Sequence, residues 1–205
     1  MLSIQTIEPN TLELLKTLAA QPELQDTRLV GGTALALQYG HRQSVDLDFF
    51  GQLPKDSEVL LDMVSRIGEV MVINRSTSIL QMVVNQVKVD FVDYSHYPWI
   101  DHPIKGDGFT LASDKDIAAM KVNAIIGRGT RKDFIDLYAL LQHYTLSELL
   151  SFYRQKYPEF SEYRALLSMT YFEDAEMQDM PRMFIDTPWL QMKQTIIKAV
   201  NDYQQ

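Results

Sequence analysis

Residues 27–50 read TRLVGGTALALQYGHRQSVDLDFF and combine several local structural signals. The largely apolar residues 27–30 predict a short strand that runs directly into the glycine pair at 31–32. Residues 33–39 then favour a helix that stops at Gly40. The segment therefore predicts a strand, a tight glycine turn and a helix, in that order.

The end of the same segment, residues 43–50, alternates apolar and polar side chains and predicts a second strand. Asp46 and Asp48 lie two positions apart on it, so both carboxylates project from one face. The opposite face would carry Val45, Leu47 and Phe49. Two such carboxylates can hold one or two divalent cations between them. Without further context, two neighbouring acids on a solvated surface are an equally ordinary interpretation.

The glycine turn adds that context. Backbone N–H groups of Gly31 and Gly32 at a helix start, together with the Thr33 hydroxyl, could meet phosphate oxygens. The alternative is that the glycine pair serves only as a tight structural turn.

A third acid is expected next to the first two. The runs 79–84 and 87–92 flank Asn85-Gln86 and predict a hairpin. If its second strand lies beside the Asp46 strand, Asp90 joins the same pocket, whereas Asp93 points to the other face of an unbulged strand. Three clustered carboxylates repel one another unless cations screen them, so the arrangement predicts Mg²⁺ or Mn²⁺.

Lys121 lies within an apolar helical stripe. Ser113 and Asp116 resemble a capping box at the start of its helix. Ile117, Lys121 and Ile125 then follow at a spacing of four residues. Lys121 either snorkels along the surface or borders a pocket where its ammonium meets a triphosphate or a carboxylate. Asp133 and Asp136 begin the next predicted helix, where the helix dipole already favours acids.

The remaining elements complete an α/β half followed by a helical half. The boundary is expected near residue 112, giving domains 1–112 and 113–205. A loop is expected over residues 96–108. Helices are expected over residues 11–20, 57–67, 114–126, 131–144, 146–157, 159–169 and 189–203.

Composition restricts the classes of function. The chain has 205 residues, no cysteine and a net charge of −8, with 46% hydrophobic residues. The lack of cysteine excludes disulfides, thiolate zinc sites and cysteine nucleophiles, so any metal must be held by oxygen or imidazole. The acidic balance argues against general electrostatic coating of nucleic acid. However, residues 115–132 carry five Lys or Arg against the single acid Asp116.

Several familiar signals are missing from the sequence. The four histidines have no metal-ligand spacing, and neither a serine-hydrolase elbow nor a Walker A sequence occurs. No window is apolar and long enough to span a membrane, and no signal peptide is recognisable. We therefore expect a cytoplasmic protein.

Taken together, the motifs resemble a known family. They are Gly31-Gly32-Thr33, Arg42-x-Ser44-x-Asp46-x-Asp48-Phe-Phe and Asp116-x4-Lys121, followed by Arg128-x2-Arg131-Lys132-Asp133-x2-Asp136-Leu-Tyr138. Over residues 28–140 the chain is similar to the AbiEii/AbiGii toxin-type nucleotidyltransferases of the polymerase β superfamily. The resemblance implies a polymerase β-like α/β domain with a mixed sheet, followed by a helical C-terminal region. Relatives transfer nucleotides from NTP, in some cases to tRNA ends, or bind GTP, and many act as toxins beside an antitoxin.

The resemblance also implies roles for individual residues. Gly31, Gly32, Thr33, Arg42 and Ser44 would bind the nucleotide. Asp46 and Asp48 would ligate metal, with Asp90 added by its strand face. Lys121, with Asp133 or Asp136, would complete the site. This sequence has Thr33 where relatives usually have serine, which preserves the hydroxyl.

The function expected is metal-dependent transfer of a nucleoside monophosphate from NTP to an acceptor hydroxyl through a two-metal mechanism. Arg128, Arg131 and Lys132 could steer an RNA end towards the site. A haloacid-type phosphatase would want Thr or Val at Phe50, and a nucleotide-sugar glycosyltransferase would want a longer segment before the acids. A third alternative is a non-catalytic module of the same fold that binds a nucleotide or an antitoxin.

Overall fold

A computed structural model gives the fold for residues 1–159 and 161–205. Within these residues the strands form one seven-stranded mixed sheet in the order β3-β4-β5-β2-β1-β7-β6. At its centre β2 runs parallel to β5 and antiparallel to β1. The strands are β1 (Thr27–Leu29), β2 (Leu47–Gly51), β3 (Val70–Arg75), β4 (Ile79–Val84), β5 (Val87–Asp93), β6 (Ile104–Lys105) and β7 (Thr110–Leu111).

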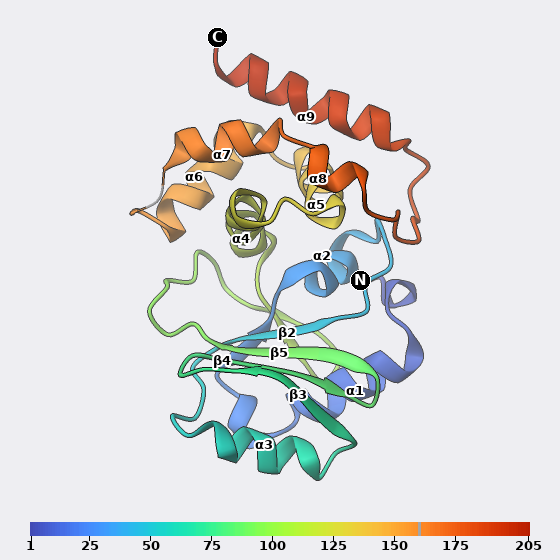
Figure 1. Cartoon of the computed structure of the whole chain (residues 1–205), viewed down its shortest axis with the longest axis vertical. Coiled ribbons are helices and arrows are strands. Elements are labelled where there is room, and N and C mark those ends of the chain that lie inside the picture. The colour runs from blue at the N-terminus through green and yellow to red at the C-terminus, as the bar shows by residue number, and fades with distance from the viewer. Residues whose placement is uncertain (160) are drawn as a thin grey trace.

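The helices divide between the two ends of the molecule. Figure 1 shows α3 on one side of the sheet, α4 to α9 gathered at the other end, and α2 between them. The α-helices are α1 (Pro9–Ala19), α2 (Gly31–Tyr39), α3 (Ser57–Ser65), α4 (Asp114–Gly127), α5 (Arg131–Leu141), α6 (Leu146–Lys156), α7 (Glu162–Met169), α8 (Glu173–Glu176) and α9 (Trp189–Tyr203). Two short 3-10 helices cover Ile4–Thr6 and Pro22–Leu24. Because α2 packs against both α4 and α5, it joins the sheet to the helical half.

The central strands follow the alternation expected from the sequence. Leu47, Phe49, Val89 and Phe91 are at most 2% exposed and belong to the hydrophobic core. The rings of Phe49 and Phe91 stack with their centroids 5.6 Å apart. The alternate residues, Asp48 among them, leave that core on the opposite face. Burial of one face thus fixes the direction in which the carboxylates point.

The predicted strand over residues 43–50 is too long at its start. β2 begins only at Leu47, and Val45 is 42% exposed rather than buried with Leu47 and Phe49. The preceding backbone bonds to other segments, because the Gln43 N–H donates to the Arg182 carbonyl and the Ser44 N–H to the Thr6 carbonyl. These long-range bonds override the local alternation.

The hairpin is confirmed and the strand before it was missed. Asn85 and Gln86 both adopt positive φ, 48° and 70°, as a two-residue hairpin turn requires. β3 pairs with β4 at the edge of the sheet, and its side chains are half-buried or exposed throughout. An edge strand without a buried face lacks the alternation by which sequence reveals strands.

The helical half follows the prediction closely. α4, α5, α6 and α9 lie where helices were expected, with ends that differ by at most a few residues. The helix predicted over 159–169 is observed as Glu162–Met169, and residue 160 lies outside the described residues. The short elements β6, β7 and α8 were not predicted. No helix in the described part of the chain is long and apolar enough to cross a membrane.

Candidate active site

The glycine pair allows charged side chains to approach the start of α2. Gly31 has φ of +69°, and a Cβ added there would lie 2.2 Å from Asp48 Oδ2. A Cβ on Gly32 would lie 2.2 Å from Arg42 Nη2. Both positions therefore exclude side chains, and the carboxylate of Asp48 lies directly against the first turn of the helix.

The acids meet because two parallel strands are in register. Asp48 on β2 pairs with Asp90 on β5, and both line a cavity of about 270 Å³ together with Asp46. Asp90 Oδ2 accepts hydrogen bonds from Gln81 Nε2 and Lys88 Nζ at 2.8 and 3.0 Å. Its other oxygen, Oδ1, is buried and has no hydrogen-bond partner among the described residues.

Asp93 lies elsewhere, as the strand pattern predicted. Its carboxylate accepts a hydrogen bond from the Ser95 N–H at 3.1 Å and lines a separate cavity beside Leu53. The structure thus places Asp90, and not Asp93, in the cavity that Asp46 and Asp48 line.

The charge on Asp48 is unfavourable in its present surroundings. Burial and the neighbouring carboxylate of Asp90 raise its pKa to about 6, and the attraction of Lys121 opposes this only in part. Asp90 Oδ1 is also buried without a partner. Buried oxygen donors that repel one another have the chemistry expected of ligands for a hard cation.

The acids do not form a closed metal cage. In residues 1–159 and 161–205 no three His, Cys, Asp or Glu side chains are grouped closely enough to hold one ion. Mg²⁺ is usually held by one or two carboxylates, with substrate phosphates and water supplying the remaining ligands. The residues present fit that mode of binding, which needs no all-protein cage.

Lys121 lies on the same side of the molecule as the acids. It lines the cavity with Asp48 and Asp90, and its Nζ lies 2.6 Å from Asp136 and 3.1 Å from Asp133. Burial alone would lower the pKa of Lys121, but the two carboxylates outweigh it and raise the pKa. Lys121 therefore remains a buried cation next to the acidic strand ends.

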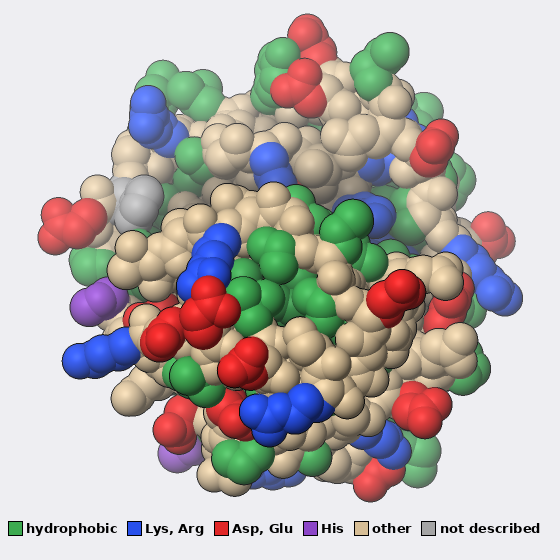
Figure 2. Space-filling model, turned by 60° about the horizontal axis from the view of Figure 1, so that its bottom comes forward, with side chains coloured by type: hydrophobic (Ala, Val, Ile, Leu, Met, Phe, Trp, Pro, Cys, Tyr) green, Lys and Arg blue, Asp and Glu red, His purple; other side chains and the backbone are tan. Residues whose placement is uncertain are grey.

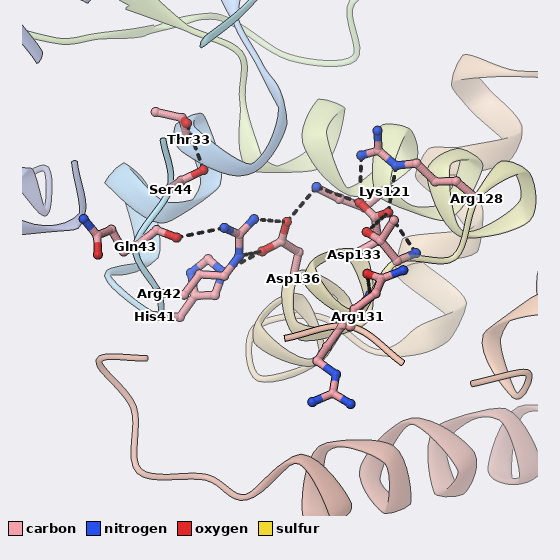
Figure 3. Close-up of polar contacts among 12 residues, drawn as sticks. Thr33, His41, Arg42, Gln43, Ser44, Lys121, Arg128, Arg131, Asp133 and Asp136 are labelled. Carbon is pink, nitrogen blue, oxygen red and sulfur yellow. Dashed lines mark hydrogen bonds and ion pairs between the residues drawn. The ribbon is translucent and has the colours of Figure 1, made fainter. Parts of the chain in front are cut away.

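Asp136 is the centre of a buried ionic network (Figure 3). Arg42 approaches it with Nε and Nη2 at 2.7 and 2.9 Å, and His41 Nε2 lies 2.8 Å away. Burial would raise the pKa of Asp136, but Arg42 and Lys121 hold it well below its ordinary value. A permanent anion on α5 thus fixes both Arg42, in the loop before β2, and Lys121 on α4.

Asp133 completes this network at the first turn of α5. Its carboxylate accepts from Thr130 in a capping box and from Arg128 at 2.9 and 3.0 Å. Burial opposes ionisation, but Lys121 and Arg128 lower the pKa of Asp133. The dipole of the helix and two cations therefore act on the same carboxylate.

A second cavity of about 410 Å³ adjoins the first. The two cavities share Asp48, Asp90, Lys121 and Arg128. One part of this combined cleft is lined mainly by charged and hydroxyl groups, and the other mainly by aromatic and apolar groups. The candidate site is thus a single cleft with the acids at its middle. On one side of the acids its lining is mainly charged, and on the other side it is mainly aromatic and apolar.

With this geometry in place, comparison with known proteins identifies the family. The model of the nucleotidyl transferase AbiEii toxins of type IV toxin–antitoxin systems matches residues 13–205. The chain belongs to the AbiEii nucleotidyl transferase toxin family. It is also 34% identical over 184 residues to an uncharacterized protein of Aquifex aeolicus, which covers 87% of this chain and 88% of that protein.

Solved structures show the same fold. A nucleotidyltransferase candidate from H. pylori superposes with a TM-score of 0.52 at 19% identity, covering 96% of this chain and 97% of that one. The nucleotidyltransferase toxin MenT4 of Mycobacterium tuberculosis gives 0.56 at 16% identity, covering 94% and 81%. The polymerase β-like fold expected for the AbiEii-family chain is therefore confirmed, and its family supports a nucleotidyltransferase.

Three residues of the AbiEii-type motifs are placed differently from the expectation. Thr33 is 1% exposed, and its hydroxyl donates to Ser44 Oγ and to the Asp46 carbonyl rather than into the cleft. Arg42 is 2% exposed and committed to Asp136. Arg131 points away from the network in Figure 3, where it bonds to the carbonyls of α8. Arg131 therefore does not line the cleft, whereas Arg128 and Lys132 do.

Sequence reasoning did not identify several residues of this AbiEii-family cleft. Gln178 lines the cleft, and His41 contacts Asp136 behind it; both meet the site only through the tertiary fold, and no spacing in the sequence marks them. Aromatic side chains that line the cleft lie in the predicted loop 96–108 and directly after β5, where no sequence pattern marked them. Asn123 lies two residues after Lys121 on the same helix. The sequence pattern marks the apolar stripe that contains Lys121, and Asn123 lies outside that stripe.

Proposed function

We propose that this chain is a metal-dependent nucleotidyltransferase that moves a nucleoside monophosphate from NTP to an acceptor hydroxyl, with an RNA or tRNA end as acceptor. One observation carries the proposal. Asp48 and Asp90 face each other across parallel strands in a cleft that also contains the buried cation Lys121. Family membership supports nucleotidyl transfer and a role as a toxin beside an antitoxin.

Asp46 and Asp48 would hold one cation, Mg²⁺ or Mn²⁺, and Asp90 would bind a second, with phosphate oxygens and water supplying the remaining ligands. The free buried oxygen of Asp90 and the raised pKa of Asp48 support this assignment. When bound, such ions would offset the carboxylate charge and stabilise the attacking and leaving oxygens of an in-line displacement.

The triphosphate would lie along the charged part of the cleft. Gly32, Ser44 and Lys132 line that part, and Gly31 begins α2 beside Asp48. Backbone N–H groups at the start of α2 would donate to phosphate oxygens. Lys121 would offset phosphate charge from the floor of the cleft, where Asp133 and Asp136 hold it in place. Thr33 and Arg42 then act as positioning residues.

The reaction proposed is a displacement at the α-phosphorus. The acceptor hydroxyl oxygen forms a bond to that phosphorus, the bond from the α-phosphorus to its bridging oxygen breaks, and pyrophosphate leaves. Where its Oδ1 is not occupied by an ion, Asp90 would instead be the group that accepts the hydroxyl proton. Arg128 and Lys132 would attract the acceptor phosphates.

The test is nucleotide transfer by a matched pair of variants. Wild-type protein incubated with each labelled NTP, total RNA and Mg²⁺ should extend an RNA species. Asp48→Asn should reduce the transfer by at least about 10²-fold, because it weakens binding of the cation that would stabilise the charge developing in the transition state. Asp93→Asn changes the same residue type on a neighbouring strand, outside the cleft, and should leave transfer unchanged.

A non-catalytic binding module of the same fold is the competing proposal. It predicts that nucleotide binds in an Asp48-dependent manner while no label reaches RNA, protein or small acceptors under any metal. Equal transfer by wild type and Asp48→Asn would contradict the assignment of the acids altogether. Pyrophosphate release measured beside transfer separates these outcomes.

A further inference from the structure

The aromatic part of the cleft has no role in the chemistry described so far. It occupies most of the cavity of about 410 Å³, within the range of roughly 300–1,000 Å³ that is typical of small-molecule sites. It adjoins the acids, since Asp48 and Asp90 form part of its lining. The residues important here are Phe50, Tyr94, Tyr97, Met120, Asn123 and Tyr157.

Its aromatic wall is held in place before any ligand binds. The rings of Tyr94 and Tyr97 stack with centroids 4.6 Å apart, and Phe50 lies 5.2 Å from Tyr94. Lys156 Nζ supports the Tyr94 ring from 5.2 Å. Tyr97 is 38% exposed, so one aromatic ring remains accessible at the cavity. A fixed, partly exposed ring is a stacking platform for a flat heteroaromatic group.

Besides Lys121, the wall formed by α4 presents one polar side chain to this cavity. Met120, Asn123, Ala124 and Gly127 line the cavity at the spacing of a single helix face. The small residues leave space, and a Cβ added to Gly127 would meet no atom within 4 Å. Asn123 is half-buried, and among the described residues nothing forms a hydrogen bond with its amide. That amide offers a donor and an acceptor side by side.

We propose that this cavity is a nucleobase subsite in which Tyr97 stacks on the base and Asn123 reads its edge. The inference rests on the proposed function, because the neighbouring acids and Lys121 would hold the phosphates. An asparagine amide pairs in two-pronged fashion with a base edge that offers an adjacent donor and acceptor. The base could belong to the NTP or to the end of the acceptor, and both present the same chemistry.

The first experiment separates recognition of the base from recognition of the phosphates. Calorimetry with Mg²⁺ compares the four NTPs and inorganic tripolyphosphate on wild type, Asn123→Leu and Asn201→Leu. Leucine keeps the branched arrangement of heavy atoms, is somewhat larger, and removes the donor and the acceptor of the amide. Asn201 is an exposed residue of α9. We expect Asn123→Leu to weaken the preferred NTP by on the order of tenfold, so that the four affinities converge. Binding of tripolyphosphate should not change.

The second experiment finds the source of the base and tests stacking. Short oligonucleotides ending in each of the four bases replace the NTPs, and a change in their ranking by Asn123→Leu assigns the subsite to the acceptor. Tyr97→Ala should weaken the bound base about tenfold, and Tyr97→Phe should retain it. Thermal unfolding checks each variant, and Asn123→Ala replaces Asn123→Leu if the latter does not fold.

The inference is overturned if Asn123→Leu, compared with Asn201→Leu, changes neither the ranking of the four NTPs nor that of the four oligonucleotides. It is also overturned if Tyr97→Ala binds the NTPs and the oligonucleotides as wild type does. Failure of the proposed function would look different. In that case tripolyphosphate would bind wild type and Asp48→Asn equally, whatever the base rankings show.

Discussion

Asp48 shows how a single residue can be unfavourable for folding and useful for function. Its carboxylate is buried beside Asp90, and the fold raises its pKa from 3.8 to about 6. Since one pKa unit corresponds to about 1.4 kcal/mol, ionising Asp48 in the folded chain costs up to roughly 3 kcal/mol. A bound cation would remove much of this cost. The residue is therefore better explained by ligand binding than by stability.

This pKa predicts how metal and pH act together on stability. The folded chain holds the Asp48 proton more tightly than the unfolded chain, so without metal its contribution to stability is lost as pH rises from about 4 through about 6. A cation binds only the ionised form. We therefore expect Mg²⁺ to raise the melting temperature clearly at about pH 7.5 and little at about pH 5.

Thermal melts across this pH range, with and without Mg²⁺, check the prediction. Asp48→Asn serves as the control and should show neither the loss of stability nor the full response to Mg²⁺. An equal Mg²⁺ response at both pH values would contradict the assignment of Asp48 as a ligand.

Individual residues also show how far sequence reasoning reaches into the site. Asp48 and Asp90 could be predicted to share a pocket because strand alternation fixes the face of each residue. The partner of Arg42 could not be predicted in this way, since Asp136 lies 94 positions away. The family resemblance assigns Arg42 to the nucleotide, whereas in the structure its guanidinium is paired with Asp136. Local periodicity predicts the face on which a side chain lies, but its partner from a distant part of the sequence depends on the tertiary fold.

At the scale of elements, a second buried ion pair joins α4, α6 and the loop that precedes α4. Lys156 on α6 is 0% exposed, and its Nζ donates to Asp116 on α4 and to the Pro98 carbonyl, both at 2.7 Å. Asp116 also accepts the Ile100 N–H at 2.8 Å. Burial lowers the pKa of Lys156, and Asp116 opposes that shift. The pair thus fastens a loop that carries part of the aromatic wall.

Replacing one partner of this ion pair should destabilise the protein more than replacing both partners. Lys156→Met leaves a buried carboxylate without its cation and should lower the free energy of unfolding by about 3–5 kcal/mol. Adding Asp116→Asn should restore part of that loss. Urea unfolding measures both. Lys115→Met is the control, because its pair with Asp101 is exposed and should cost within about 1 kcal/mol. Additive losses in the double variant would contradict this interpretation.

Elements differ in how well the sequence reveals them. α9 was predicted with its observed ends because its apolar residues keep one helical face, with Met192, Ile196 and Val200 buried. β3 was missed because an edge strand with no buried face carries no alternation. The start of β2 was misplaced because the backbone at Gln43 and Ser44 bonds to distant segments. An element with a regular pattern of buried residues can be predicted from the sequence. An exposed edge strand, or a segment whose backbone bonds to distant residues, carries no such pattern.

At the scale of the whole molecule, the proposed function requires an acidic chain to attract a polyanionic acceptor. The net charge is −8, and on the face drawn in Figure 2 basic and acidic side chains are interspersed rather than gathered into one positive area. Within the cleft, Arg128 and Lys132 are the cations proposed to meet RNA phosphates. Attraction would therefore be local to the cleft and involve few phosphates.

The salt dependence of RNA binding should reflect this small number. Two phosphate contacts to a single strand predict that the logarithm of the binding constant falls with the logarithm of salt at a slope of about −1 to −2. Arg128→Gln should reduce the steepness by about 0.7. Fluorescence anisotropy over a salt series measures the slope. A slope steeper than about −5 would show that the RNA contacts a much larger surface than the cleft.

The ionic network around Asp136 also sets when during synthesis the cleft can form. The strand carboxylates leave the ribosome first, but Lys121 and the α5 anion that holds it follow only much later in the chain. A nascent polypeptide that has emerged only as far as β5 therefore carries the acids without the cation opposite them. The cleft, and any activity that depends on it, therefore cannot be complete until translation has passed α5.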